Sequence, residues 1–87
     1  MGTPSTKLKI VQVEWKDAVG KDGWVDLVNL PDPARIVTVG WLVGQNEQSV
    51  TIAASIDLDK LDEVGDVIVI PRGMVRKMRT LKGGLHE

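Results

Sequence analysis

The chain has 87 residues, a net charge of −1, a single histidine, no cysteine and three tryptophans as its only aromatic residues. This length allows one domain with a modest hydrophobic core. The lack of cysteine excludes disulfide bonds, thiolate metal sites and a cysteine nucleophile, and the longest apolar runs are too short to span a bilayer. We therefore expect a cytoplasmic protein with no membrane partner, stabilised by forming a homo-oligomer.

Charge is unevenly distributed along the chain. Residues 71–87 carry five Lys or Arg and one Glu, a net charge of +4. Residues 1–70 carry six basic and eleven acidic side chains, a net charge of −5. A basic tail on an acidic body predicts either an anionic partner or charge pairing with the body or with a neighbouring subunit.

The first third of the chain predicts one strand and a long connection. Residues 1–6 are rich in Pro, Ser and Thr and predict a disordered leader. Apolar and polar residues then alternate, with Val11, Val13 and Trp15 on one face, which is the period of a strand. The next apolar stretch, 24–30, predicts either a short strand or an irregular segment pinned by its tryptophan, and it ends at a Pro-Asp-Pro break.

Residues 35–45 are rich in β-branched side chains and apolar on both faces of a strand. This pattern predicts a central strand that is covered on both sides. Gly40 inside it marks a bend, a bulge or the close approach of another backbone. Trp41 shares a face with three valines, so we expect it in the core.

The rest of the chain predicts three further strands. Residues 44–48 form a polar hairpin loop, and residues 49–58 alternate between a buried and a polar face. The charged residues 59–66 predict a connection, and residues 66–70 predict a strand that ends at a proline. The pattern at 74–82 fits either a helix or an edge strand, and we favour the strand because the corner before it leaves little room to start a helix.

Five short strands with very little helix predict an all-β fold, a small, five-stranded and strongly bent barrel of the Sm-like or SH3-like kind. We expect the barrel domain to span residues 7–82 and residues 83–87 to form a flexible tail.

Two stretches carry the resemblance to the Sm-like family. The sequence VGWLVGQNEQSVTIAASI at 39–56 looks like the strand–loop–strand unit of that family. The sequence DVIVIPRGMVRKMRTL at 66–81 is similar to its second signature, an apolar strand that passes through an Arg/Gly turn into a final strand. Trp15, Asp17 and the two Gly-Trp pairs are also similar to a pattern in small proteins of tailed-phage and prophage genomes.

The resemblance implies a ring-shaped homo-oligomer more than it implies RNA binding. Barrels of this family pair the fourth strand of one subunit with the fifth strand of the next, here residues 66–70 with residues 75–81 of a neighbour, which hides both edges. The chain departs from the family because it leads directly into a strand rather than a helix. Its loop at 46–48 and the residues that follow also lack the Asp and Asn that line the family's uridine pocket.

Catalytic and metal chemistry have little support in the sequence. His86 has no companion ligands, and the acidic residues at 57–63 lack the glycine and terminal glutamate of a calcium loop. Ser49 and Ser55 have no neighbouring general base. We expect no metal, no cofactor and no enzymatic activity. The enzyme alternative, based on carboxylates, would need three or more of four aspartates in one cleft. These aspartates are Asp17, Asp22, Asp26 and Asp66.

The favoured function is that of a phage-type accessory protein, in the host cytoplasm, that binds an anionic ligand at the Arg72 turn, either nucleic acid or a nucleotide. The alternative is a protein–protein adaptor that docks a host or virion protein through its acidic face and the loop around Trp24. Trp24 either stacks on a planar ligand or clamps the loop over the barrel end, and we favour the clamp because a small barrel needs closed ends. The ligand-binding candidates are Arg72, Arg76, Lys77, Arg79, Trp24 and Asp17.

Overall fold

The computed structural model describes residues 8–18, 20 and 22–83. The predicted leader at 1–6 lies outside the described residues, and of the predicted tail only Gly83 lies inside them. The chain forms five strands and two short 3₁₀ turns. In chain order the elements are β1 (Ile10–Asp17), η1 (Leu27–Asn29), β2 (Ala34–Gln45), β3 (Ser49–Asp57), β4 (Lys60–Pro71), η2 (Arg72–Met74) and β5 (Val75–Thr80).

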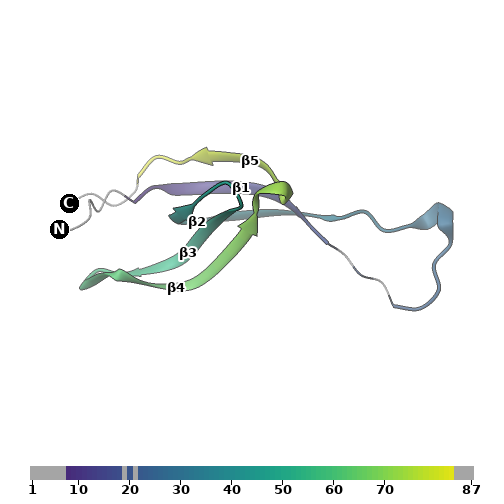
Figure 1. The fold of residues 1–87 in the computed structure, drawn as a ribbon, viewed down its shortest axis with the longest axis horizontal. Coiled ribbons are helices and arrows are strands. Elements are labelled where there is room, and N and C mark those ends of the chain that lie inside the picture. The colour runs from purple at the N-terminus through teal and green to yellow at the C-terminus, as the bar shows by residue number, and fades with distance from the viewer. Residues whose placement is uncertain (1–7, 19, 21, 84–87) are drawn as a thin grey trace.

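The five strands form one antiparallel sheet in the order β4-β3-β2-β1-β5 (Figure 1). The prediction of an all-β fold with five strands and very little helix is therefore confirmed. The sheet is open, with β4 at one edge and β5 at the other. No helix in the described part of the chain is long and apolar enough to cross a membrane.

The turn η2 makes the sheet curl, because it joins the two edge strands directly. In a flat sheet, four strand spacings would separate β4 from β5 by about 19 Å. The four residue steps from Pro71 to Val75 span at most about 14 Å even when fully extended. The edges must therefore approach each other at the η2 end, and Figure 1 shows β4 bending toward η2 below β1 and β5.

The core lies on the inner face of this curl. Val11, Val13 and Trp15 of β1 are buried, whereas Gln12 and Glu14 between them are not, so the alternation predicted for this strand is confirmed. The remaining core comes from three side chains of β3 and β4 and from partly buried residues around them. These are Val50, Ile52 and Ile70, with Ile36, Leu42, Ile68, Met74, Val75 and Met78 packed against them.

The core tryptophan is Trp15, and the prediction that Trp41 fills the core is wrong. The indole Nε1 of Trp15 donates a hydrogen bond of 3.0 Å to Thr38 Oγ1, which satisfies its polar atom within the packed face. Trp41 is only half-buried and stands outside the core cluster. Its register partner Ile10 belongs to the face opposite Val11, so Trp41 lies on the outer face of the sheet.

β2 is central in the strand order, but it is covered on one side only. Val37 and Val39 are 57% and 53% exposed, respectively. They pair with Glu14 and Gln12, whose side chains also face away from the core. The predicted cover on both sides is therefore wrong at these two valines, since the single sheet provides a second layer only through its own curl.

The loop predicted at 59–66 is also wrong, because β4 begins at Lys60. A two-residue turn at Leu58 and Asp59 is sufficient, since Asp57 Oδ1 accepts hydrogen bonds from the backbone N–H of Asp59 (2.8 Å) and of Lys60 (3.2 Å). The charged side chains that suggested a loop lie on an edge strand and are exposed. Charges at such an edge discourage uncontrolled strand pairing.

The alternation predicted for residues 49–58 holds only in its first half. Val50 and Ile52 are buried as expected, but Ala53 is fully buried and Ala54 is exposed. Ala53 pairs with Trp41 next to Gly40, where the backbones of β2 and β3 come unusually close. The strand predicted for the C-terminal segment is confirmed as β5.

Gly40 confirms the close approach predicted for it. A Cβ atom built at Gly40 would lie 2.6 Å from Ile52 Cγ2 and 2.7 Å from the carbonyl oxygen of Ala53. Only a residue without a side chain fits between these atoms, so Gly40 permits the contact between β2 and β3 that buries Ile52.

We predict that Gly40→Ala destabilises the protein by about 1–3 kcal/mol, because the added methyl group overpacks the sheet against backbone that cannot move away. Gly44→Ala in the same strand is the matched control, since the nearest atom to its Cβ is Thr51 Cβ at 3.7 Å. Urea unfolding followed by tryptophan fluorescence measures both variants. Equal stability of the two would contradict the assigned role of Gly40.

Candidate functional site

The Arg72 turn is bonded to the neighbouring hairpin loop of its own chain. The Arg72 backbone N–H donates to the carbonyl oxygen of Gln48 (2.9 Å). Its side chain donates from Nε to the carbonyl oxygen of Asn46 (2.9 Å) and from Nη2 to Gln45 Oε1 (2.8 Å). The candidate that sequence reasoning favoured most therefore has a structural role, which is to fix η2 to the loop between β2 and β3.

That loop is itself ordered by Asn46. Its Oδ1 atom accepts hydrogen bonds of 2.8 Å from the backbone N–H groups of Gln48 and Ser49, and its own N–H donates to the Ser49 carbonyl oxygen (2.9 Å). Gly73 has a φ outside the left-handed region, so the turn of η2 does not depend on glycine at this position. The corner is held by the hydrogen bonds of Arg72 and Asn46.

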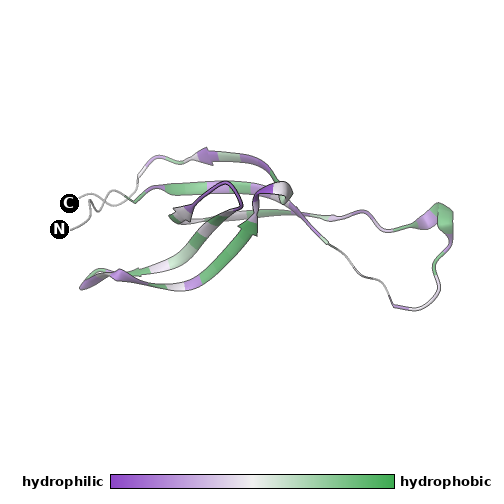
Figure 2. Cartoon of the chain, in the orientation of Figure 1, coloured by the Kyte–Doolittle hydropathy of each residue, from purple (hydrophilic) through white to green (hydrophobic). Residues whose placement is uncertain are grey.

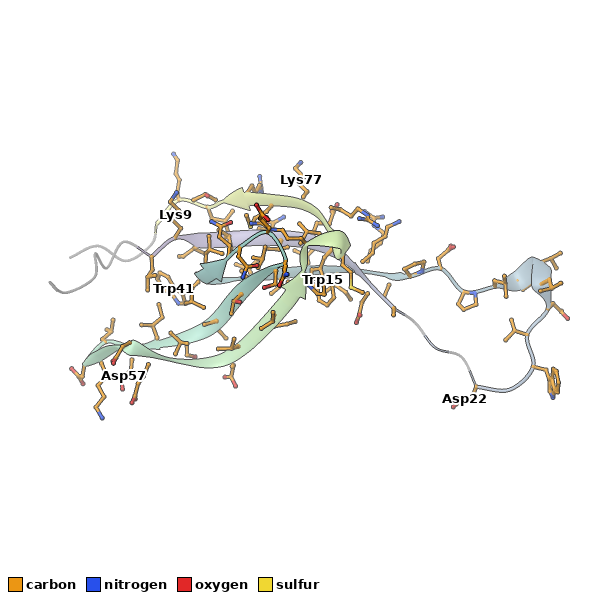
Figure 3. The ribbon with its side chains drawn as sticks, viewed as in Figure 1. Lys9, Trp15, Asp22, Trp41, Asp57 and Lys77 are labelled. Atoms are coloured by element: carbon orange, nitrogen blue, oxygen red, sulfur yellow. The ribbon has the colours of Figure 1, made fainter. Side chains whose placement is uncertain are left out.

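The basic candidates divide into two groups. Arg76 Nη1 donates to the carbonyl oxygen of Gly73 (3.2 Å) and so stays with the turn. Lys77 and Arg79 lie on β5, where they pair in register with Glu14 and Gln12 of β1. Figure 3 shows Lys77 projecting from the edge of the sheet.

A shallow hollow of about 280 Å³ lies over these cross-strand pairs. It is lined by Gln12, Glu14, Lys77 and Arg79. Arg79 Nη2 donates to Gln12 Oε1 (3.3 Å), and Glu14 Oε1 lies 3.9 Å from Arg35 Nη2. The hollow therefore combines two cations with a carboxylate, and Gln12 and Glu14 were missed in the sequence because only the strand register brings them beside β5.

Asp17 lies at the far end of the β1–β2 ladder. It pairs with Ala34 in register, and its Oδ1 accepts a hydrogen bond of 2.9 Å from the backbone N–H of Ala18. Asp17 thus marks the base of the connection between β1 and β2, residues 18–33, which we call the arm.

The arm projects from the sheet along the longest dimension of the molecule (Figure 1). The molecule measures 57 × 22 × 21 Å along its principal axes. Asp22, labelled in Figure 3, lies in the arm well away from the strands. No residue of η1, at the far end of the arm, is buried.

The tip of the arm is apolar and exposed. Trp24 has a relative exposure of 104%, and Val28 has 89%. The apolar colour at the far end of the molecule is clear in Figure 2. We call the exposed large apolar residues of the arm the arm tip. They are Trp24, Leu27, Val28 and Leu30.

The predicted clamp of Trp24 over the end of the fold is wrong. The β1–β2 ladder continues to the Asp17–Ala34 pair, so the arm starts beyond the end of the sheet rather than above it. Trp15 already fills the core on this side. Sequence reasoning named Trp24 but missed Leu27, Val28 and Leu30, for which the only signal was an apolar stretch without strand alternation before a proline break.

Within residues 8–18, 20 and 22–83, no three His, Cys, Asp or Glu side chains form a group that could hold a metal ion. His86 lies outside these residues. No family model matches the chain, and no curated protein or solved structure matches it.

We predict that Arg72→Ala lowers the free energy of unfolding by about 1–2 kcal/mol, because it removes two side-chain hydrogen bonds that hold η2 to the β2–β3 loop. Lys77→Ala, which removes a cation from the same basic segment, should change stability by less than about 0.5 kcal/mol. Urea unfolding of both variants is the measurement. An Arg72→Ala protein as stable as Lys77→Ala would show that these bonds do not hold the corner.

Proposed function

We propose that this protein is a small non-enzymatic binding module that docks a protein partner through the arm. The single observation behind the proposal is the exposed arm tip, whose four large apolar side chains lie within seven residues of one another. Monomeric proteins seldom expose contiguous apolar patches that have no function. Tryptophan is also among the residues that contribute most when they are buried at protein interfaces.

The shape of the arm indicates the kind of surface that it fits. A narrow projection with apolar side chains inserts into a concave apolar site, as long recognition loops do. Three acidic side chains flank the apolar ones, which favours a partner surface with a basic rim. They are Asp22, Asp26 and Asp32.

The sheet serves the arm as a scaffold in this proposal. Both ends of the arm continue into β1 and β2, which pair over eight residue positions from Ile10–Trp41 to Asp17–Ala34. Binding residues on a connection that starts and ends in a rigid ladder are placed more reproducibly than on an unsupported tail.

Binding of an anionic ligand, either nucleic acid or a nucleotide, is the second candidate. Lys77 and Arg79 are exposed cations on β5, and they support it. Two observations weigh against this candidate. At the turn, the guanidinium of Arg72 is engaged with Gln45 and Asn46. In the hollow over β1 and β5, Glu14 adds a negative charge. A single-stranded oligonucleotide titrated at rising salt tests this candidate, since phosphate contacts weaken steeply with salt.

The Sm-like barrel and its ring-shaped homo-oligomer also belong to this proposal. The strand order with open edges at β4 and β5 supports it, as does the curl that η2 imposes. The two edges also differ in charge, since β4 carries Lys60 against Asp62, Glu63 and Asp66, a net charge of −2, whereas β5 carries Arg76, Lys77 and Arg79, a net charge of +3. Pairing of residues 66–70 with residues 75–81 of a neighbour would join complementary edges. We also propose a phage-type accessory role, on the resemblance of Trp15, Asp17 and the two Gly-Trp pairs.

The test of the arm is a comparison of affinity-tagged variants purified from the cells that express the protein. We predict that changing Trp24, Leu27 and Val28 together to Ser reduces co-purification of the bound protein at least about tenfold, because each buried apolar side chain contributes ~1.5 kcal/mol or more. Leu58→Ser is the matched control, since Leu58 is an exposed apolar residue in the turn between β3 and β4.

An untagged second copy is co-expressed and quantified in the same preparations, so that self-association and binding of other proteins are measured separately. Equal recovery of every bound protein by the arm variant and by the Leu58→Ser control would overturn the proposed function.

A further inference from the structure

The outer face of the sheet carries a partly exposed apolar strip. Val37 and Val39 of β2 are more than half exposed. They stand next to each other on one face, two positions apart, and Trp41 continues the same row. We call Val37, Val39 and Trp41 the outer strip.

Cations flank the outer strip on the side of β1 and β5 and at its Arg35 end. Across the strands, the register aligns Val39 with Gln12 and Arg79. It aligns Val37 with Glu14 and Lys77. The next cross-strand pair on the same face is Lys16–Arg35. This flank and end of the outer strip therefore carry four cations and one carboxylate, a net charge of +3. They are Lys16, Arg35, Lys77, Arg79 and Glu14.

The arm has the complementary pattern. Its centre is the apolar arm tip, and residues 18–33 contain three aspartates and one lysine, a net charge of −2. The arm thus combines apolar side chains with acidic ones, and the outer strip combines apolar side chains with a basic flank. Such charge complementarity gives specificity and fast association at protein interfaces.

The arm tip cannot easily reach the outer strip of its own chain. The arm runs away from the sheet beyond the Asp17–Ala34 pair, and Val37 lies only three residues after that point. A return would require a reversal within residues 31–33, where two prolines fix φ and hold the preceding residues extended. Leu30, immediately before them, is already extended with φ −66° and ψ 140°.

We propose that the arm of one copy docks on the outer strip of a second copy of this chain. The inference rests on the proposed function, in which the arm binds a protein, and it names that protein. A second copy supplies, at equal concentration, an apolar surface with a basic flank, and docking covers an arm tip and an outer strip in one contact. Each copy offers one arm and one outer strip, so the exchange closes as a two-fold dimer or as a ring.

Cysteine cross-linking tests the contact directly, because the chain contains no cysteine of its own. Val28→Cys protein with one tag is mixed with Val39→Cys protein with a second tag, and the mixture is oxidised briefly. A disulfide needs Cβ atoms about 4 Å apart. We expect the mixed disulfide to form at least about tenfold faster than in a control mixture of Val28→Cys with Leu58→Cys, because docking raises the local thiol concentration to the millimolar range.

Light scattering and sedimentation of the full chain provide the second measurement. Val37→Asp places a carboxylate opposite the acidic arm, so we expect it to weaken self-association by at least about tenfold, whereas Leu58→Asp leaves it unchanged. Added salt should also weaken self-association of the unmodified protein.

The outcomes separate the inference from the proposed function. A mixed disulfide together with weakened self-association of Val37→Asp supports both. Only Val28–Val28 disulfides, or a monomer at every concentration, would overturn the inference. In that case the co-purification test decides the proposed function. If the serine variant of the arm tip recovers less of a protein other than this chain, the proposed function stands. If the serine variant recovers every bound protein as well as the Leu58→Ser control does, both the inference and the proposed function fail.

Discussion

The connection through η2 is the constraint on which the rest of the structure depends. It joins strands at opposite edges of a five-stranded sheet with only three residues between them. The sheet must curl to satisfy it, and the curl creates an inner face for Val13, Ile52 and Ile70. Arg72 fixes the corner to the β2–β3 loop, and Gly40 allows the tight contact between β2 and β3, so both residues serve this one geometry.

Sequence reasoning predicted the strands that have one buried and one polar face, because period-two alternation follows directly from burial on one side. It placed β1 and β5 correctly and failed at the start of β4. Lys60, Asp62 and Glu63 are exposed at the edge of the sheet, and in a sequence a charged edge strand resembles a loop. The two-residue turn that allows β4 to start early depends on two hydrogen bonds that the Asp57 carboxylate accepts from backbone N–H groups, and the sequence does not show that Asp57 has this role.

The candidate site was less predictable than the fold, because each role depends on a partner far away in the chain. The bonds of Arg72 go to residues 26 and 27 positions earlier, and nothing local distinguishes this arginine from one that binds phosphate. The three tryptophans were equally ambiguous. Register decides that Trp15 faces the core and Trp41 faces outward, whereas Trp24 is exposed because the β1–β2 ladder ends before the arm begins.

A small sheet that uses its inner face to build a core has only its outer face, its edges and its connections left for binding. A chain of this length buries a limited share of its surface when it folds alone, and this chain keeps Val37, Val39 and the arm tip exposed in addition. Any contact that covers these residues in the folded state alone stabilises the fold by mass action. These exposed apolar residues are therefore the ones through which a partner would make the fold more stable, which ties folding and binding to one surface.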